Sequence, residues 1–176
     1  CSEAAEWYRK EAEKGHAYAQ NRLACMYFKG EGVQQDYIEA LDWYRKAAEQ
    51  GNSAAQSNVG HMYGNGKGVV RDYKEAMKWY RKSAEQGNKN AQFGMGYLCQ
   101  NGHGVLKDYT EAARWFRLAA ENGHHGAQYL LGMIYYDGGM GVSKDNAESK
   151  KWLKRAYEGG SGKAAKAWEE FEMWKY

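Results

Sequence analysis

A repeat with a period of 36 residues runs through the whole sequence. Its clearest marker is a column of tryptophans, four spaced by 36 residues and a fifth that follows after 37: Trp7, Trp43, Trp79, Trp115 and Trp152. A glycine column and pairs of alanine and glutamine keep the same step. The one extra residue falls within residues 137–141, which therefore belong to a loop. A unit this short cannot bury its own apolar face, so the chain must fold as a stack of similar units.

Apolar residues recur at helical spacing twice in each unit. In the first unit, one stripe is formed by Ala19, Leu23, Met26 and Tyr27, and the other by Ala40, Tyr44, Ala47 and Ala48. Both stripes follow the i, i+4, i+7, i+8 pattern of one helix face. The spacing predicts two helices in each unit, each about 12–15 residues long.

A Gly-x-Gly-Val segment separates the two helices of each unit and predicts a turn. An aspartate follows each turn and has a glutamate three residues later, which predicts an N-cap with a reciprocal capping box. These pairs are Asp36/Glu39, Asp72/Glu75, Asp108/Glu111 and Asp145/Glu148. The predicted fold is all-α: a right-handed αα superhelix (solenoid) of 36-residue helix–turn–helix repeats.

Gly60, Gly96 and Gly132 interrupt the first helix of three successive units. Glycine inside a helix costs about 1 kcal/mol relative to alanine. A cost repeated at one column predicts that a neighbouring helix approaches closely there with its bulky Trp and Tyr side chains. The first unit has Ala24 in this column.

The combined motifs resemble the Sel-one-like repeat (SLR), a relative of the tetratricopeptide repeat. They are Ala-x-x-x-Leu/Val/Met-Gly/Ala-x-x-Tyr, Gly-x-Gly-Val, Asp-Tyr-x-x-Ala and Trp-Tyr-Arg-Lys-Ala-Ala-Glu-x-Gly. The resemblance implies one solenoid domain over residues 1–176, with full repeats at 19–54, 55–90, 91–126 and 127–163. Residues 1–18 correspond to the second half of a further repeat, which indicates a trimmed longer protein. Residues 164–176 are expected to form a C-terminal capping helix, lined on one side by Trp168, Phe171 and Trp174.

The sequence offers no set of residues suited to catalysis, to a cofactor or to a metal ion. The Gly-x-Gly turns follow helices and lack the GxGxxG pattern of a phosphate-binding loop. The five histidines form no HExxH motif, and Cys99 occupies a core column in place of tyrosine. A nucleophilic cysteine would need a base and an orienting group beside it. We therefore predict that the chain is not an enzyme and carries no cofactor.

Charge and hydropathy give a second set of expectations. The net charge of +3 is too balanced to indicate a nucleic-acid partner. An Arg-Lys stripe recurs once per repeat, but each arginine has a glutamate four residues later, as in Arg45/Glu49, which predicts ordinary surface pairs.

The longest apolar stretch, residues 129–136, is too short to cross a membrane. We expect a monomer without membrane insertion. The resemblance implies a bacterial periplasmic or secreted location, whereas unpaired cysteines favour the cytoplasm.

Three columns of the first helices, just off the apolar stripe, vary sharply between repeats. In tetratricopeptide-like solenoids these helices line the concave surface, so the resemblance places a partner there. The predicted partner-binding residues are Asn21, Cys25, Phe28, Ser57, His61, Phe93, Tyr97, Gln100, Tyr129, Met133 and Tyr136. Tyrosine and methionine suit a surface that must be apolar and adaptable.

The predicted function is a non-catalytic scaffold or adaptor that binds a partner protein or peptide in its concave groove. The resemblance implies a bacterial protein, because such solenoids are frequent in bacterial envelope, virulence and signalling systems. Some members are immunity proteins that neutralise secreted toxins, which gives one alternative. Binding of RNA or polysaccharide along the aromatic and basic surface is a second alternative.

Overall fold

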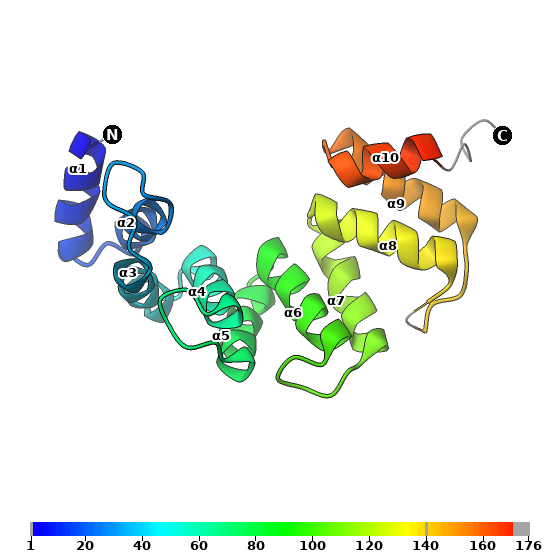
Figure 1. Cartoon of the computed structure of the whole chain (residues 1–176), viewed down its shortest axis with the longest axis horizontal. Coiled ribbons are helices and arrows are strands. Elements are labelled where there is room, and N and C mark those ends of the chain that lie inside the picture. The colour runs from blue at the N-terminus through cyan, green and yellow to red at the C-terminus, as the bar shows by residue number, and fades with distance from the viewer. Residues whose placement is uncertain (1, 140, 171–176) are drawn as a thin grey trace. The chain divides into compact units, whose positions relative to one another are not determined.

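The computed structural model describes the backbone of residues 2–139 and 141–170, and the side chains of residues 3–139 and 141–167. Within these residues the chain forms ten helices and no strand (Figure 1). The helices are α1 (Ser2–Glu13), α2 (Ala17–Lys29), α3 (Tyr37–Glu49), α4 (Ser53–Asn65), α5 (Tyr73–Glu85), α6 (Lys89–Asn101), α7 (Tyr109–Glu121), α8 (His125–Asp137), α9 (Asn146–Glu158) and α10 (Gly162–Glu170). The all-α solenoid of paired helices is confirmed. The side chains predicted to line the capping helix, from Trp168 onward, lie outside the described residues.

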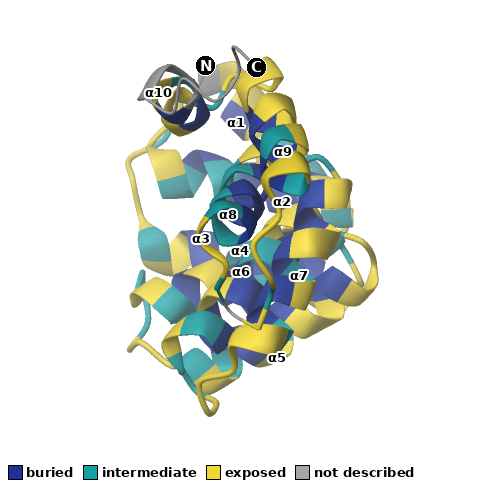
Figure 2. Ribbon diagram, turned by 90° about the vertical axis from the view of Figure 1, so that its right-hand side faces the viewer, coloured by how far each residue is buried: buried dark blue, intermediate teal, exposed yellow. Residues whose placement is uncertain are grey.

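The chain divides into two compact units, residues 1–91 and residues 92–176. Within each unit, consecutive helices pack against each other, for example α4 with α5 in the first unit and α8 with α9 in the second. Buried side chains follow one stripe of each helix, while the opposite stripe is exposed (Figure 2). Each helix therefore contributes its apolar face to a core that it shares with its neighbours.

The predicted aspartate N-caps are confirmed. Asp36 Oδ1 accepts hydrogen bonds from the backbone N–H groups of Ile38 and Glu39, and Asp72, Asp108 and Asp145 cap their helices in the same way. The reciprocal half of the predicted capping box is wrong, because the Asp36 N–H donates to the carbonyl of Tyr27 at 3.0 Å. Each cap thus fastens the turn to the end of the preceding helix. Three of the glutamates at the capping-box position instead pair with a cation three residues later: Glu75 with Lys78, Glu111 with Arg114 and Glu148 with Lys151.

Gly68, in the turn between α4 and α5, must be glycine because the backbone of Tyr37 approaches it closely. Gly68 has a φ of +67°, and a Cβ atom at this position would collide with the carbonyl oxygen of Tyr37. The turn between α4 and α5 therefore rests directly on the first residue of α3. A positive φ together with backbone contact explains why only glycine fits here.

The close approach predicted at the helix-internal glycines is confirmed. An added Cβ would lie 2.8 Å from Tyr80 Cδ1 at Gly60, 2.7 Å from Phe116 Cδ1 at Gly96 and 2.6 Å from Leu153 Cγ at Gly132. The approaching side chains come from one column of the second helices, which holds the predicted Tyr opposite Gly60 but Phe and Leu at the other two sites, and no Trp. The tryptophans lie on the flank of this column, and most of them remain partly exposed.

The glutamine of each Ala-Gln pair is buried and links successive helices. Gln56 Nε2 donates to the Ala48 carbonyl at 3.1 Å, and Gln56 Oε1 accepts from Gln86 Nε2 at 2.8 Å. Gln20 makes the same two bonds, to Ala12 and from Gln50. Because a buried amide without partners is costly, this pattern accounts for glutamine at these positions.

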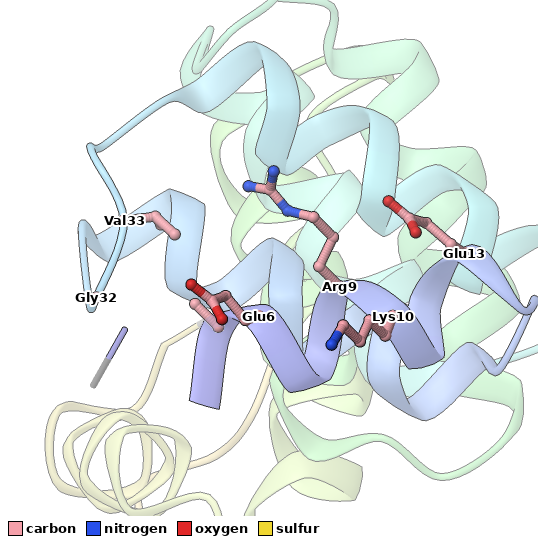
Figure 3. Close-up of a pocket in the computed structure, with 7 residues that line it drawn as sticks. Glu6, Arg9, Lys10, Glu13, Gly32 and Val33 are labelled. Atoms are coloured by element: carbon pink, nitrogen blue, oxygen red, sulfur yellow. The ribbon is translucent and has the colours of Figure 1, made fainter. Parts of the chain in front are cut away.

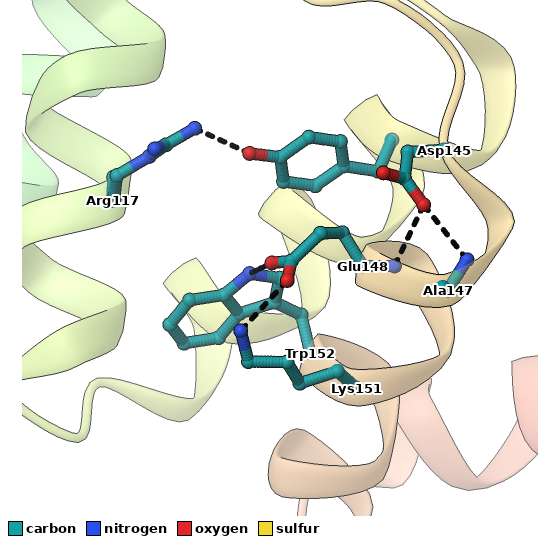
Figure 4. A network of polar contacts seen from close by, with 7 residues as sticks. Arg117, Asp145, Ala147, Glu148, Lys151 and Trp152 are labelled. Carbon is teal, nitrogen blue, oxygen red and sulfur yellow. Dashed lines mark hydrogen bonds and ion pairs between the residues drawn. The ribbon is translucent and has the colours of Figure 1, made fainter.

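Three of the recurrent arginines bond to a tyrosine of the next repeat rather than to the predicted glutamate, while Arg9, Arg81 and Arg117 are exposed, as predicted for a surface stripe. Arg9 donates to the hydroxyl of Tyr27, Arg45 to that of Tyr63 and Arg117 to that of Tyr135. Figure 4 shows Arg117 reaching this hydroxyl beside the capped start of α9. There Glu148 accepts from Trp152 Nε1 at 3.0 Å and from Lys151 Nζ at 2.7 Å. The hydrogen bond and the positive charge of Lys151 lower the pKa of the Glu148 carboxyl, and the hydrogen bond from Trp152 lowers it further.

Tyr135→Phe is expected to lower the free energy of unfolding by about 1 kcal/mol, because Arg117 loses its acceptor while the packing of the ring stays intact. Urea denaturation followed by circular dichroism measures this change. Tyr109→Phe is the matched control, since the ring of Tyr109 is exposed at the start of α7. Equal stability of both variants would contradict a stabilising role for the arginine–tyrosine tie.

Candidate interaction surface

The eleven predicted partner-binding residues lie on the first helices of the repeats and are divided between the two units. The α2–α4 surface, in the first unit, comprises Asn21, Cys25, Phe28, Ser57 and His61. The α6–α8 surface, in the second unit, comprises Phe93, Tyr97, Gln100, Tyr129, Met133 and Tyr136.

Three members of the α2–α4 surface take part in packing between helices. Asn21 and Ser57 are only 9% and 6% exposed, and Asn21 Oδ1 accepts from Asn58 Nδ2 at 3.4 Å. Cys25 Sγ accepts from the Tyr44 hydroxyl at 3.2 Å. Burial raises the pKa of Tyr44, and the hydrogen bond to Cys25 raises it further. The Tyr44 hydroxyl therefore stays protonated and remains a donor. Cys25 is a free thiol.

Phe28 and His61 form the more accessible part of the same surface. Their ring centroids are 6.0 Å apart in an edge-to-face arrangement, and Phe28 also packs against Tyr37 at 5.2 Å. Desolvation of the His61 ring lowers its pKa, and the positive charge of Lys67 lowers this pKa further. The imidazole is therefore neutral at pH 7 and adjoins a cation.

Phe93 anchors the α6–α8 surface. Its ring stacks on His124 with centroids 4.3 Å apart and packs against Phe116 at 5.6 Å. His124 is the N-cap of α8, where its Nδ1 accepts from the Ala127 N–H at 3.0 Å. The stack thus joins α6 to the start of α8. The three varying columns drew attention to Phe93, but no sequence signal indicated its histidine partner.

The other five members of the α6–α8 surface are open to solvent to differing degrees. Tyr97 is 50% exposed and meets the His103 ring at a centroid distance of 5.9 Å. Lys144 Nζ lies 5.1 Å from the ring of Tyr136. Gln100, Tyr129 and Met133 are half-buried. The side chains are mainly aromatic and partly accessible, which suits contact with another protein.

A pocket of about 460 Å³ lies between α1 and the turn that follows α2 (Figure 3). It is lined by Ala5, Glu6, Arg9, Lys10, Glu13, Gly32 and Val33. No sequence motif indicates this pocket, since it forms where a turn passes the helix of the preceding repeat. Its two cations and two carboxylates share one helix, and Arg9 is already committed to Tyr27. Because the lining carries both positive and negative side chains, it favours neither an anionic nor a cationic ligand.

No three His, Cys, Asp or Glu side chains among the described residues are grouped so that they could hold a metal ion. In the same residues, no helix has the length and hydropathy needed to span a membrane.

Solved structures similar to this one include proteins from two bacteria. A protective antigen present in uropathogenic Escherichia coli strains, which displays an SLR fold, is 40% identical over 89% of this chain, with a TM-score of 0.82. A Sel1 repeat protein from Oxalobacter formigenes is 37% identical over 94% of this chain, with a TM-score of 0.88. The chain spans 33% of the first protein and 66% of the second.

A more distant structure shares the fold. Immunity protein Pa5087 from Pseudomonas aeruginosa is 20% identical over 91% of this chain and 75% of its own, with a TM-score of 0.54. No curated protein matches the chain at a significant level.

The Sel1 repeat model matches residues 1–16, 17–52, 53–88, 89–124 and 125–161. These spans begin two residues before the predicted repeat boundaries and agree with the observed starts of α2, α4, α6 and α8. Sel1 repeats generally mediate protein–protein interactions. Because the matched spans cover nearly all of the sequence, this chain belongs to the Sel1 repeat family.

Proposed function

We propose that the chain is a non-catalytic scaffold that binds a segment of a partner protein on its α6–α8 surface. The observation that carries this proposal is the half-exposed ring of Tyr97 on α6. The equivalent columns of α6 and α8 hold half-buried aromatic and methionine side chains. An exposed aromatic ring in an apolar setting is a common anchor of protein interfaces.

Comparison between repeats supports this assignment. The core columns stay largely apolar in every repeat, whereas the columns of the α6–α8 surface alternate between polar and apolar side chains and hold a different residue in each repeat. Positions that only maintain the solenoid have no need to differ. The accessible members of the α2–α4 surface, Phe28 and His61, belong to the same columns.

Inhibition of a secreted toxin is a narrower form of the same function. Its support is the fold shared with the Pseudomonas aeruginosa immunity protein. Binding of RNA or polysaccharide is the second candidate, favoured by the aromatic rings of the α6–α8 surface. Binding to RNA would weaken steeply with salt because counterions are released from the phosphates.

Tyr97→Glu and Met133→Glu are each expected to weaken peptide binding at least about tenfold, because a carboxylate would be buried at the anchor of the interface. The probes are peptides recovered by the wild-type protein from a random phage-displayed library, and their affinities are measured by fluorescence anisotropy. Tyr109→Glu is the control, since Tyr109 is an exposed tyrosine on α7. All variants must retain the wild-type circular dichroism spectrum.

Equal affinity of wild type and both α6–α8 variants would contradict the proposal, and so would a library that yields no specific peptide. Tighter, strongly salt-dependent binding of polyuridine would favour the RNA alternative instead.

A further inference from the structure

Acidic residues are distributed unevenly between the two helices of each repeat. Of the 22 acidic residues in the sequence, Asp137 is the only one within α2, α4, α6 and α8. Each of the second helices α3, α5, α7 and α9 carries at least two, in addition to its aspartate cap. The surface of the first helices therefore carries one carboxylate, that of Asp137 on α8, although the chain as a whole is rich in them, and α2 and α4 carry none.

In the first unit, the same surface also carries cations. Arg22 and Lys29 are exposed on α2, and Lys67 follows α4. The Arg22 guanidinium lies 5.8 Å from the centroid of the Tyr8 ring, which restricts where the charge can point. Lys67 Nζ donates to the Tyr37 hydroxyl at 3.1 Å and is held beside His61. Lys29 is the least available, with Glu31 at 3.4 Å.

Amides and rings complete this surface, with Asn58 Nδ2 donating to Asn21 Oδ1 and Asn65 Nδ2 to the carbonyl of His61. Asn58 and Asn65 lie one helical turn on either side of the exposed His61, and the contact between Phe28 and His61 joins α4 to α2. Tyr18, one turn before Arg22, is 65% exposed. Cations, amides and rings are thus placed together without a carboxylate on either helix.

We infer that the α2–α4 surface is a second docking site, which binds an acidic segment of a partner protein. The inference rests on the proposed function only in taking the partner to be a protein. Charge complementarity selects an acidic occupant, since Arg22 and Lys67 face no carboxylate from α2 or α4. A nucleic acid fits less well, because few cations are present and Glu31 stands among them.

The test compares three fluorescent peptides that alternate tyrosine with glutamate, glutamine or lysine. At low salt, the glutamate peptide is expected to bind the wild-type protein, and its affinity should fall about tenfold as salt screens the charges. The glutamine and lysine peptides should bind at least about tenfold more weakly.

A matched pair of variants locates the site. His61→Lys is expected to tighten binding of the glutamate peptide and His61→Glu to weaken it, with about a tenfold difference between the two. Both variants lose the same ring contact with Phe28, so the difference reports charge alone. Ile38→Glu, at an exposed position of α3, adds the same charge as His61→Glu and should leave binding unchanged.

The outcomes separate this inference from the proposed function. Loss of glutamate-peptide binding in Tyr97→Glu, with no difference between the His61 variants, would overturn the inference and place acidic ligands on the α6–α8 surface. Failure of the glutamate peptide to bind at low salt would overturn the inference while leaving the library result on the α6–α8 surface intact. Stronger binding of polyuridine than of the glutamate peptide would overturn it in favour of RNA.

Discussion

Replacing Gly60 by alanine is expected to lower the free energy of unfolding by about 1–3 kcal/mol, even though alanine is the better helix former. The new methyl group would lie 2.8 Å from Tyr80 Cδ1 and 2.9 Å from Tyr80 Cγ. Tyr80 is 8% exposed and is packed between helices, so its ring has no free space to enter. The steric cost therefore exceeds the gain in helix propensity.

Gly64→Ala provides the matched control one turn later in α4. A Cβ at Gly64 would meet only the Cβ of Ala76, at the ordinary contact distance of 3.7 Å. This variant is expected to be neutral or more stable by about 0.5–1 kcal/mol. Urea denaturation of both proteins measures the contrast. A Gly60→Ala variant as stable as Gly64→Ala would show that the close approach of Tyr80 does not explain the glycine.

Gln56→Met is expected to destabilise the protein by about 1–2 kcal/mol, because two hydrogen bonds of a buried amide are lost. Methionine has a similar length but removes one donor from the buried Ala48 carbonyl, which keeps the Gly51 N–H at 3.0 Å, and it leaves Gln86 without the acceptor that it contacts at 2.8 Å. Gln56 is 5% exposed, so water cannot replace these partners freely.

Gln86→Met serves as the control for this second prediction. The side chain of Gln86 is exposed, and its loss removes one of the two bonds of Gln56 while leaving the Ala48 carbonyl satisfied. We expect a cost below about 1 kcal/mol, measured by the same urea titration. If both variants lost equal stability, the buried bond to Ala48 would not be the dominant interaction.

The elements predicted from sequence were those that depend on local rules. Asp36 caps α3 because an aspartate before an amphipathic segment satisfies the free N–H groups of the first turn, whatever surrounds it. Gly60 was also interpretable, since a repeated helix-breaking residue implies a neighbour, although the sequence did not show that the neighbour is Tyr80.

Interactions between repeats were less accessible from the sequence. Arg45 has Glu49 within reach on its own helix, so the local rule favoured an ion pair, but packing places the hydroxyl of Tyr63 nearer. The recurrence of Gln20 and Gln56 was visible, whereas their bonds join helices that only the tertiary structure brings together. For the candidate surface, column variation selected Asn21 and Ser57 together with Tyr97, and burial then distinguished them.

The central claim is that a partner segment binds on α6 and α8, and NMR of the tyrosine rings tests it most directly. A library-selected peptide is added to protein carrying labelled tyrosine. We predict that the ring signals of Tyr97, Tyr129 and Tyr136 shift on binding, while those of Tyr109 and Tyr157, which are exposed on second helices, do not. Shifts confined to Tyr109 and Tyr157 would contradict the claim and place the interface on the second helices.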